Sequence, residues 1–268
     1  MTWSHVQTAY NSGASSGSPS ILSVPISAVG SGNAVVVTVS TPSAAHPTSV
    51  KDSAGNTYTQ RLSTSNTSSG ADVITFVLGN ITNAPTSIIV TWAVSASGVV
   101  VAATEFSNPA GTILSNPFDV GHGNQQNSIG NGTDIFTSGS ATTTVGSDLI
   151  YGVCLNVSSP VGEPTAGTGY TLGNSGSDAT QSVGWATEWK VQSSAGAVAA
   201  TFSTSSGTNF FGTTNMVSLK APLAAASSPL YNPWPQLGPL VSQFKALGKS
   251  FDGWRKNRAG LLIPSYQM

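Results

Sequence analysis

The sequence predicts an all-β fold, an antiparallel β-sandwich of jelly-roll type, followed by an extended C-terminal arm. From about residue 5 to residue 220, short β-branched runs alternate with turns rich in Gly, Ser, Asn and Pro, the spacing of a sandwich or barrel. Almost none of this region has helical periodicity. Hydrophobic residues make up 39% of the 268 residues, which is enough to build a core. We therefore expect a β-sandwich domain over residues 1–220.

Alternation of apolar and polar residues identifies the expected strands. Val35, Val37 and Val39 alternate with Val36, Thr38 and Ser40, so we expect one buried and one solvent-exposed face. Similar runs occupy residues 73–78, 87–92, 99–106, 148–155, 181–191, 197–203 and 215–220. Two antiparallel sheets packed face to face bury such strands most simply.

Residues 50–58 are predicted to form a hairpin. Asp52 can accept the hydrogen bonds of an Asx turn, and Gly55 can adopt a positive φ. The functional alternative is a calcium loop with Asp52 and Asn56 as ligands. Calcium loops generally supply several carboxylates and this segment supplies one, so we expect a turn and no metal site.

The composition argues against catalysis. Charged residues make up 7% of the chain, where an ordinary soluble domain has roughly 25%. The three histidines, His5, His46 and His122, lie in turn-rich or terminal segments, and the single cysteine, Cys154, allows no disulfide. No nucleophile elbow, phosphate-binding loop or dinucleotide-binding motif occurs. We predict no catalytic residue and no cofactor. A glycoside hydrolase, the enzymatic alternative, needs two acids facing one cleft.

Two features inside the predicted domain allow a functional interpretation. Glu105 shares strand parity with Val101 and Ala103, so we expect its carboxylate on the buried face, paired with a hydroxyl, a backbone donor or a cation. Trp185 and Trp189 lie four residues apart on one face of a strand. They are either core residues or a platform on which a glycan ring stacks.

After Lys220 the composition changes. Residues 221–239 are predicted to form a linker, because they are rich in Pro, Ala and Ser. In the arm, residues 240–268, apolar side chains recur at spacings of four and three, and this pattern predicts a short amphipathic helix. Its apolar face needs a partner surface, because exposed Leu, Phe and Trp promote aggregation. The predicted anchoring residues are Trp234, Leu240, Phe244, Lys245, Leu247, Lys249, Phe251, Trp254, Arg255, Lys256 and Arg258.

The charges separate along the chain in the same way. The segment from Pro229 has five basic residues and one acidic residue, hence +4, and the preceding part has four basic and nine acidic residues, hence −5. Opposite charges favour docking on a protein partner, including another copy of the chain. An anionic membrane and nucleic acid are the other partners that such an arm could fit. The total of −1 provides no general polybasic field, so we expect no nucleic-acid partner, and no apolar run is long enough to span a membrane.

Four segments resemble a loosely defined group of β-sandwich proteins from bacteriophages and environmental bacteria. They are WSHVQ at residues 3–7, VKDSAGNTYT at residues 50–59, VAATEFS at residues 101–107 and DLIYG at residues 148–152. The resemblance covers roughly residues 1–220 and concerns the fold, since these segments are turns and core strands. It implies a virion-associated or surface-associated protein, and the group has no established catalytic residues.

Taken together, these features predict a non-enzymatic structural component of a bacteriophage virion, namely a decoration, head-fibre or tail-associated protein. The arm is expected to anchor it to capsid or tail proteins, or to its own copies in a homo-oligomer. The first residues lack the basic and apolar regions of a secretory signal, so we expect synthesis in the host cytoplasm and a final location in the virion. The alternative function is a carbohydrate-binding or adhesive β-sandwich module on a cell or virion surface, with Trp185 and Trp189 as the glycan-stacking residues.

Overall fold

A computed structural model of the chain describes residues 3–12, 20–42, 45–128, 132–158, 161–206, 210–222, 254–256 and 262–264. The chain divides into two compact units, Met1–Ala224 and Ala225–Met268. The described residues contain β-strands and no helix, and every strand pair is antiparallel, which confirms the all-β prediction. Among these residues, no helix is long and apolar enough to cross a membrane.

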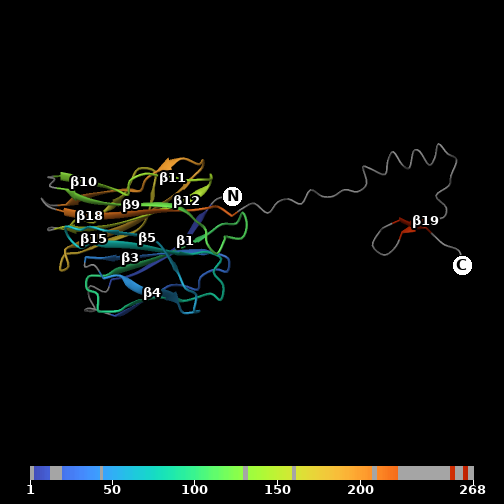
Figure 1. The fold of residues 1–268 in the computed structure, drawn as a ribbon, viewed down its shortest axis with the longest axis horizontal. Helices are drawn as coiled ribbons and strands as arrows, with labels where there is room; N and C mark the ends of the chain where they lie inside the picture. The colour runs from blue at the N-terminus through green and yellow to red at the C-terminus, as the bar shows by residue number, and fades with distance from the viewer. Residues whose placement is uncertain are drawn as a thin grey trace. The chain divides into compact units, whose positions relative to one another are not determined.

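The first unit contains four main sheets (Figure 1). Sheet A has the order β1 (Ser4–Ser12), β8 (Val100–Ser107), β3 (Ala34–Thr41), β6 (Asp72–Leu78) and β5 (Thr59–Ser65). Sheet B has the order β2 (Ile21–Pro25), β7 (Ser87–Trp92) and β4 (Pro47–Asp52). Sheet C has the order β14 (Thr171–Asp178), β15 (Val183–Gln192), β12 (Asp148–Ser158), β18 (Phe210–Leu219) and β9 (Phe118–Ser128). Sheet D has the order β10 (Gly132–Thr137), β17 (Thr201–Ser206) and β13 (Thr165–Ala166). A short ladder joins β11 (Ala141–Thr142) to β16 (Ala197–Val198).

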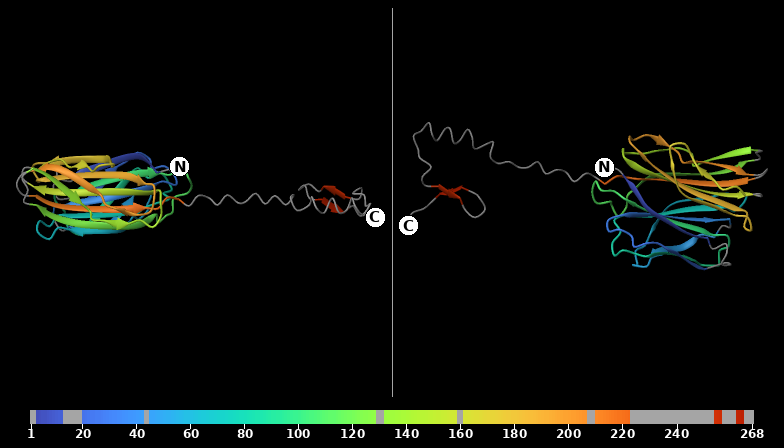
Figure 2. Two further views of the ribbon diagram at one scale, coloured as in Figure 1. Left: turned by 90° about the horizontal axis from the view of Figure 1, so that it is seen from above. Right: turned by 180° about the vertical axis from the view of Figure 1, so that it is seen from behind.

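Three hydrophobic cores hold these sheets in the layer order B, A, C, D. The first core joins residues of sheets A and B, for example Val37 and Val90. The second joins the other face of sheet A to sheet C, and the third joins the other face of sheet C to sheet D. In Figures 1 and 2 the later strands, in green to orange, stack on the earlier strands, in blue to teal. Residues 3–222 thus contain two sandwich-like sheet pairs where the sequence analysis expected one.

Strand β3 shows the consequence of this stacking. Its alternate residues Val35, Val37 and Val39 face sheet B, as the alternation predicted. The opposite face is also buried, because Val36 packs in the core against sheet C and Thr38 is almost completely enclosed. The expected solvent-exposed face of this strand is therefore covered by a second pair of sheets.

The two sheet pairs repeat one topology. The first half consists of strands β1 to β8, and the second half consists of strands β9 to β18 without the short β11 and β16. Counted in chain order, the first, eighth, third, sixth and fifth strands of each half form its five-stranded sheet. The second, seventh and fourth strands form its three-stranded sheet. A bulge recurs at the same place, between Gln60 and Leu62 on β5 and between Leu172 and Asn174 on β14. The sequence Ala-Gly-x-x-Tyr-Thr leads into each of these strands, at residues 54–59 and 166–171. The chain therefore contains an internal structural repeat.

Buried hydrogen bonds fix the contact between the two halves. Asn215 donates from Nδ2 to the carbonyl of Val73 at 2.8 Å, and the hydroxyls of Tyr151 and Thr104 lie 3.1 Å apart. Because buried polar groups are costly without partners, these bonds disfavour other alignments of sheet A on sheet C.

The second unit is described over two short strands, β19 (Trp254–Lys256) and β20 (Leu262–Pro264), which pair antiparallel. Trp254, Arg255 and Lys256 are therefore extended, and Trp254 does not continue the predicted amphipathic helix. Gly253 directly before it weakens a helix by roughly 1 kcal/mol relative to Ala. The remaining predicted anchoring residues lie outside the described residues; they are Trp234, Leu240, Phe244, Lys245, Leu247, Lys249, Phe251 and Arg258.

Candidate functional site

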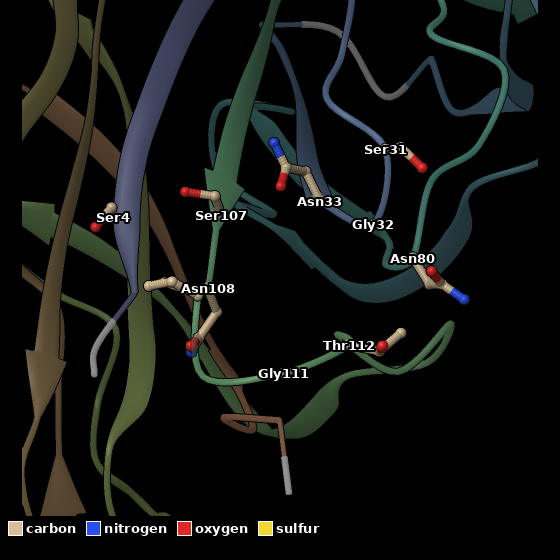
Figure 3. Close-up of a pocket in the computed structure, with 10 residues that line it drawn as sticks. Ser4, Ser31, Gly32, Asn33, Asn80, Ser107, Asn108, Gly111 and Thr112 are labelled. Carbon is tan, nitrogen blue, oxygen red and sulfur yellow. The ribbon is translucent and has the colours of Figure 1, made fainter. Parts of the chain in front are cut away.

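A polar pocket of about 520 Å³ lies at the end of sheet A where β1 and β3 begin and where β6 and β8 end (Figure 3). The lining residues are small and uncharged, and most carry a hydroxyl or a carboxamide. They are Ser4, Ser31, Gly32, Asn33, Asn80, Ser107, Asn108, Pro109, Gly111 and Thr112. In Figure 3, Ser107 and Asn108 lie on one side, Ser31 and Asn80 on the other, and Gly111 and Thr112 below. Sequence reasoning did not identify these residues, because Ser, Asn and Thr are common throughout the chain.

The buried carboxylate of Glu105 fixes one wall of this pocket. Oε1 accepts hydrogen bonds from the backbone N–H of Gly30 at 2.8 Å and from Nδ2 of Asn33 at 2.5 Å, and Oε2 accepts one from Nε2 of Gln7 at 2.5 Å. The expected inward orientation of Glu105 is confirmed, and its partners are neutral donors. A Cβ at Gly30 would lie 2.5 Å from Nδ2 of Asn33, so a larger residue at this position would displace the Asn33 amide. Asn33 is thereby held with its Oδ1 unbonded to any described residue.

Two further asparagines of the pocket have unusual environments. Asn108 is 7% exposed, and its Oδ1 accepts a hydrogen bond from the N–H of Ala110 at 3.0 Å. Its Nδ2 is buried and has no hydrogen-bond partner among the described residues. Asn80 is exposed at the pocket rim with a φ of 53°, a left-handed conformation that asparagine tolerates better than most residues. Left-handed backbone conformations cluster at ligand sites, and a buried polar group without a partner is one that a bound ligand or ion can satisfy.

The repeat places different residues at the corresponding end of the second half. The pairing registers put Ser218 at the position of Glu105 and Asp148 at the position of Asn33. The hydroxyl of Ser218 donates to Oδ2 of Asp148 at 2.7 Å. In the second half the carboxylate therefore belongs to Asp148, at the position of Asn33, whereas in the first half it belongs to Glu105. Burial, with a smaller contribution from the nearby Asp119, raises the pKa of Asp148 to about 6.

The neighbouring Asp119 is held by its own partners. Burial acts to raise its pKa, but hydrogen bonds from the N–H and the hydroxyl of Thr144, both at 2.6 Å, and the ammonium of Lys220 at 3.2 Å lower it below the ordinary value. This end of the second half therefore carries two carboxyl groups and an ammonium group, in contrast to the neutral pocket of the first half.

A second buried carboxylate, Glu188, lies between sheets C and D. Its two oxygens accept hydrogen bonds from the backbone N–H groups of Gly167 at 2.7 Å and Thr201 at 2.9 Å. Burial raises its pKa to about 7. The ammonium of Lys190 lies 4.2 Å from the centre of the Tyr170 ring beside it. Because both oxygens are bonded to the main chain, Glu188 ties sheet C to the segments that lead into β14 and β17.

The two candidate glycan-stacking residues lie at the contact between sheets A and C. Trp185 is 6% exposed in the core, and the half-buried Trp189 packs against the same core, so their predicted common face is confirmed. Trp189 stacks on His5 with ring centres 6.0 Å apart and meets Phe106 edge to face. Both indoles are thus occupied by protein contacts, and the buried Trp185 offers no open face to a sugar.

The predicted turn at Asp52 is confirmed. Its Oδ1 accepts hydrogen bonds from the N–H groups of Ala54 and Asn56, each at 3.0 Å, and Gly55 has a φ of 86°. The side chain of Asn56 donates to Oδ2 of Asp52 at 2.9 Å, which directs its amide rather than its carbonyl oxygen at the carboxylate. Asp52 and Asn56 therefore satisfy each other within the turn.

The histidines and the cysteine are separated in the fold. His46 contacts Asp72 at 2.8 Å, His122 lies 2.6 Å from the carbonyl of Ser138, and His5 lies beside Trp189. Within the described ranges, no group of three His, Cys, Asp or Glu side chains could hold a metal ion. Cys154 is buried, and burial raises the pKa of its thiol.

Comparison with family models, with curated proteins and with solved structures finds no match to this chain, so its function is argued from its own residues.

Proposed function

We propose that the protein is a non-enzymatic structural component of a bacteriophage virion, a decoration, head-fibre or tail-associated protein anchored through its C-terminal arm. The observation that carries this proposal is the division of the chain into a unit of residues 1–224 with a charge of −5 and a unit of residues 225–268 with a charge of +4. A compact, layered body joined to a short basic and apolar segment suits a protein displayed on a particle and attached by one end.

The proposal includes a jelly-roll type for each sheet pair. In support, the first, eighth, third and sixth strands of each half are neighbours in one sheet, and the second, seventh and fourth are neighbours in the other. Apart from the fifth and sixth strands, which pair with each other in one sheet, successive strands alternate between two facing sheets, as most strands do in jelly rolls, which are frequent in viral capsid proteins.

The partner is another virion protein, from the capsid or the tail, or a further copy of the chain. The five basic residues of the arm would approach an acidic surface under electrostatic attraction, and the indole groups of Trp234 and Trp254 would supply the apolar contacts. Among the described residues, β19 and β20 pair only with each other, and the free edge of such a short sheet can extend the sheet of a partner.

Truncation of the arm tests this function. Particles would be purified on a density gradient from cells that produce the full chain, a chain ending at Ala224, or a chain in which Lys245, Lys249, Arg255, Lys256 and Arg258 are replaced by Gln. We expect the full chain in the particle fraction, the truncated chain folded but absent from it, and the Gln variant reduced relative to the full chain, with the largest difference at low salt. Equal incorporation of the full and truncated chains would contradict the anchoring role.

A further inference from the structure

We infer that the pocket at the end of sheet A is a binding site for a neutral saccharide. Its polar lining consists of three carboxamides, three serine hydroxyls and one threonine hydroxyl, with no charged and no aromatic side chain. Carboxamides and hydroxyls both donate and accept hydrogen bonds, and so do the hydroxyls of a sugar. A charged ligand would find no counter-charge in this lining.

The pocket wall is held in place by buried contacts. Glu105 is completely buried, and no ion pair compensates it among the described residues. A carboxylate in this position is costly, and its three hydrogen bonds go to β1, to Gly30 and to Asn33. The effect of these bonds is to fix the loop at residues 30–33 and the orientation of the Asn33 amide. Fixed polar groups of this kind bind a ligand with less loss of conformational entropy.

The groups that remain free point to a ligand. Oδ1 of Asn33 is an unused acceptor, and Nδ2 of Asn108 is a buried donor without a partner in the described part of the chain. The side chains of Ser31, Asn80 and Thr112 also make no hydrogen bond to another described residue. A volume of about 520 Å³ is within the usual range of small-molecule sites, roughly 300–1,000 Å³. The polar lining favours a polyhydroxyl compound over an apolar one.

The repeat provides an internal comparison. Both halves have the same strand order, yet the second half places Asp148, Asp119 and Lys220 at the corresponding end, where Lys220 and Thr144 bond to Asp119 and Ser218 bonds to Asp148. A neutral pocket is therefore not an inevitable result of this topology. It depends on the residues of the first half, namely Glu105 behind the wall and asparagines at the surface.

The test uses chemical-shift changes in the full-length, ¹⁵N-labelled protein. The probes are maltotriose, cellotriose and N,N′,N″-triacetylchitotriose, three neutral saccharides, with 6′-sialyllactose as an anionic comparison. We expect at least one neutral probe to shift the side-chain amide signals of Asn33, Asn80 and Asn108 in a saturable manner, and we expect the anionic probe to bind more weakly than the best neutral one.

A matched pair of variants locates the site. Asn80→Gly removes one carboxamide from the pocket at a position whose backbone already suits glycine, and it should weaken the binding of that probe about tenfold. Asn83→Gly makes the same change at an exposed residue with a φ of 67° outside the pocket, and it should leave binding unchanged. Both variants retain the backbone, so loss of folding does not explain a difference between them.

Three results would overturn the inference. They are the absence of saturable shifts with all three neutral probes, equal weakening by the two glycine variants, and shifts confined to the indole signals of Trp185 and Trp189. The inference goes beyond the anchoring role and is independent of it, because the pocket lies within Met1–Ala224 and a failure of particle incorporation would leave these spectra unchanged.

Discussion

Asn33 donates a hydrogen bond from Nδ2 to Oε1 of Glu105 at 2.5 Å, across the wall of the polar pocket. In the second half the same two positions are occupied by Asp148 and Ser218, with the carboxylate on the other partner. The two halves thus each place one acidic residue in this hydrogen-bonded pair, but at different members of it. In the first half that acid accepts hydrogen bonds from three neutral donors beside an open pocket, whereas in the second half it lies next to a further carboxylate, that of Asp119.

Replacement of Glu105 by Gln tests the importance of this carboxylate. Its oxygens accept from three N–H donors, so an amide NH₂ in place of one oxygen faces a donor and loses at least one hydrogen bond. We expect Glu105→Gln to lower the free energy of unfolding by about 1–3 kcal/mol, measured by urea denaturation. Glu163→Gln, at an exposed position, is the control and should change it by less than about 0.5 kcal/mol. Equal effects of the two substitutions would show that the buried bonds do not stabilise the fold.

The stability of the protein should depend on pH through Glu188. Burial raises its pKa to about 7 in the folded protein from 4.5 in the unfolded chain, so the folded state binds this proton more tightly. The stabilisation by the protonated form is complete below pH 4.5 and is lost as the pH rises through about 7. We therefore expect the urea midpoint to fall between about pH 5 and pH 7.

The variant Glu188→Gln isolates this contribution. It removes the titrating group while keeping its size, so the fall in the urea midpoint over this pH range should become smaller. Asp148, whose burial raises its pKa to about 6, gives a residual dependence of the same sign. An unchanged pH profile in Glu188→Gln would exclude Glu188 as the responsible group.

The conformation of Asn80 leads to a prediction about stability. Its φ of 53° is left-handed, where glycine has no steric penalty. Asn80→Gly should therefore fold without loss of stability, within about 0.5 kcal/mol of the wild type, whereas Asn80→Val should destabilise the protein by about 1–2 kcal/mol because a β-branched residue is strained there. Thermal unfolding measures both. Equal melting temperatures for the two variants would indicate that this loop relaxes to another conformation.

Local features could be predicted from the sequence because their chemistry is local. The turn at residues 50–58 depends on the carboxylate of Asp52 and the flexibility of Gly55, and both are visible in the sequence. The inward orientation of Glu105 followed from strand parity. The pocket could not be predicted, because β-sheet pairing brings together residues 4, 31–33, 80 and 107–112, none of which has a distinctive type. The two Ala-Gly-x-x-Tyr-Thr sequences were a signal for the repeat that the strand pattern alone did not reveal.

The second buried face of β3 was also hidden in the sequence. Thr38 and Ser40 suit a solvated strand face, yet here they are enclosed together with Val36 beneath sheet C. Thr can occupy either environment, since its hydroxyl is small and its methyl group packs against neighbours. Alternation therefore predicted the face toward sheet B correctly and could not show that a further sheet pair covers the other face.

This arrangement is tested by a matched pair of substitutions on β3. Val37 faces sheet B and Val36 faces sheet C, and both are fully buried. Val→Thr keeps the volume and places a hydroxyl in the core, which costs about 1–3 kcal/mol when the hydroxyl finds no partner. If sheet A is covered on both sides, Val36→Thr and Val37→Thr lower the free energy of unfolding by similar amounts in urea. In a single pair of sheets Val36 would be in water, and its substitution would then have almost no effect while that of Val37 remained costly.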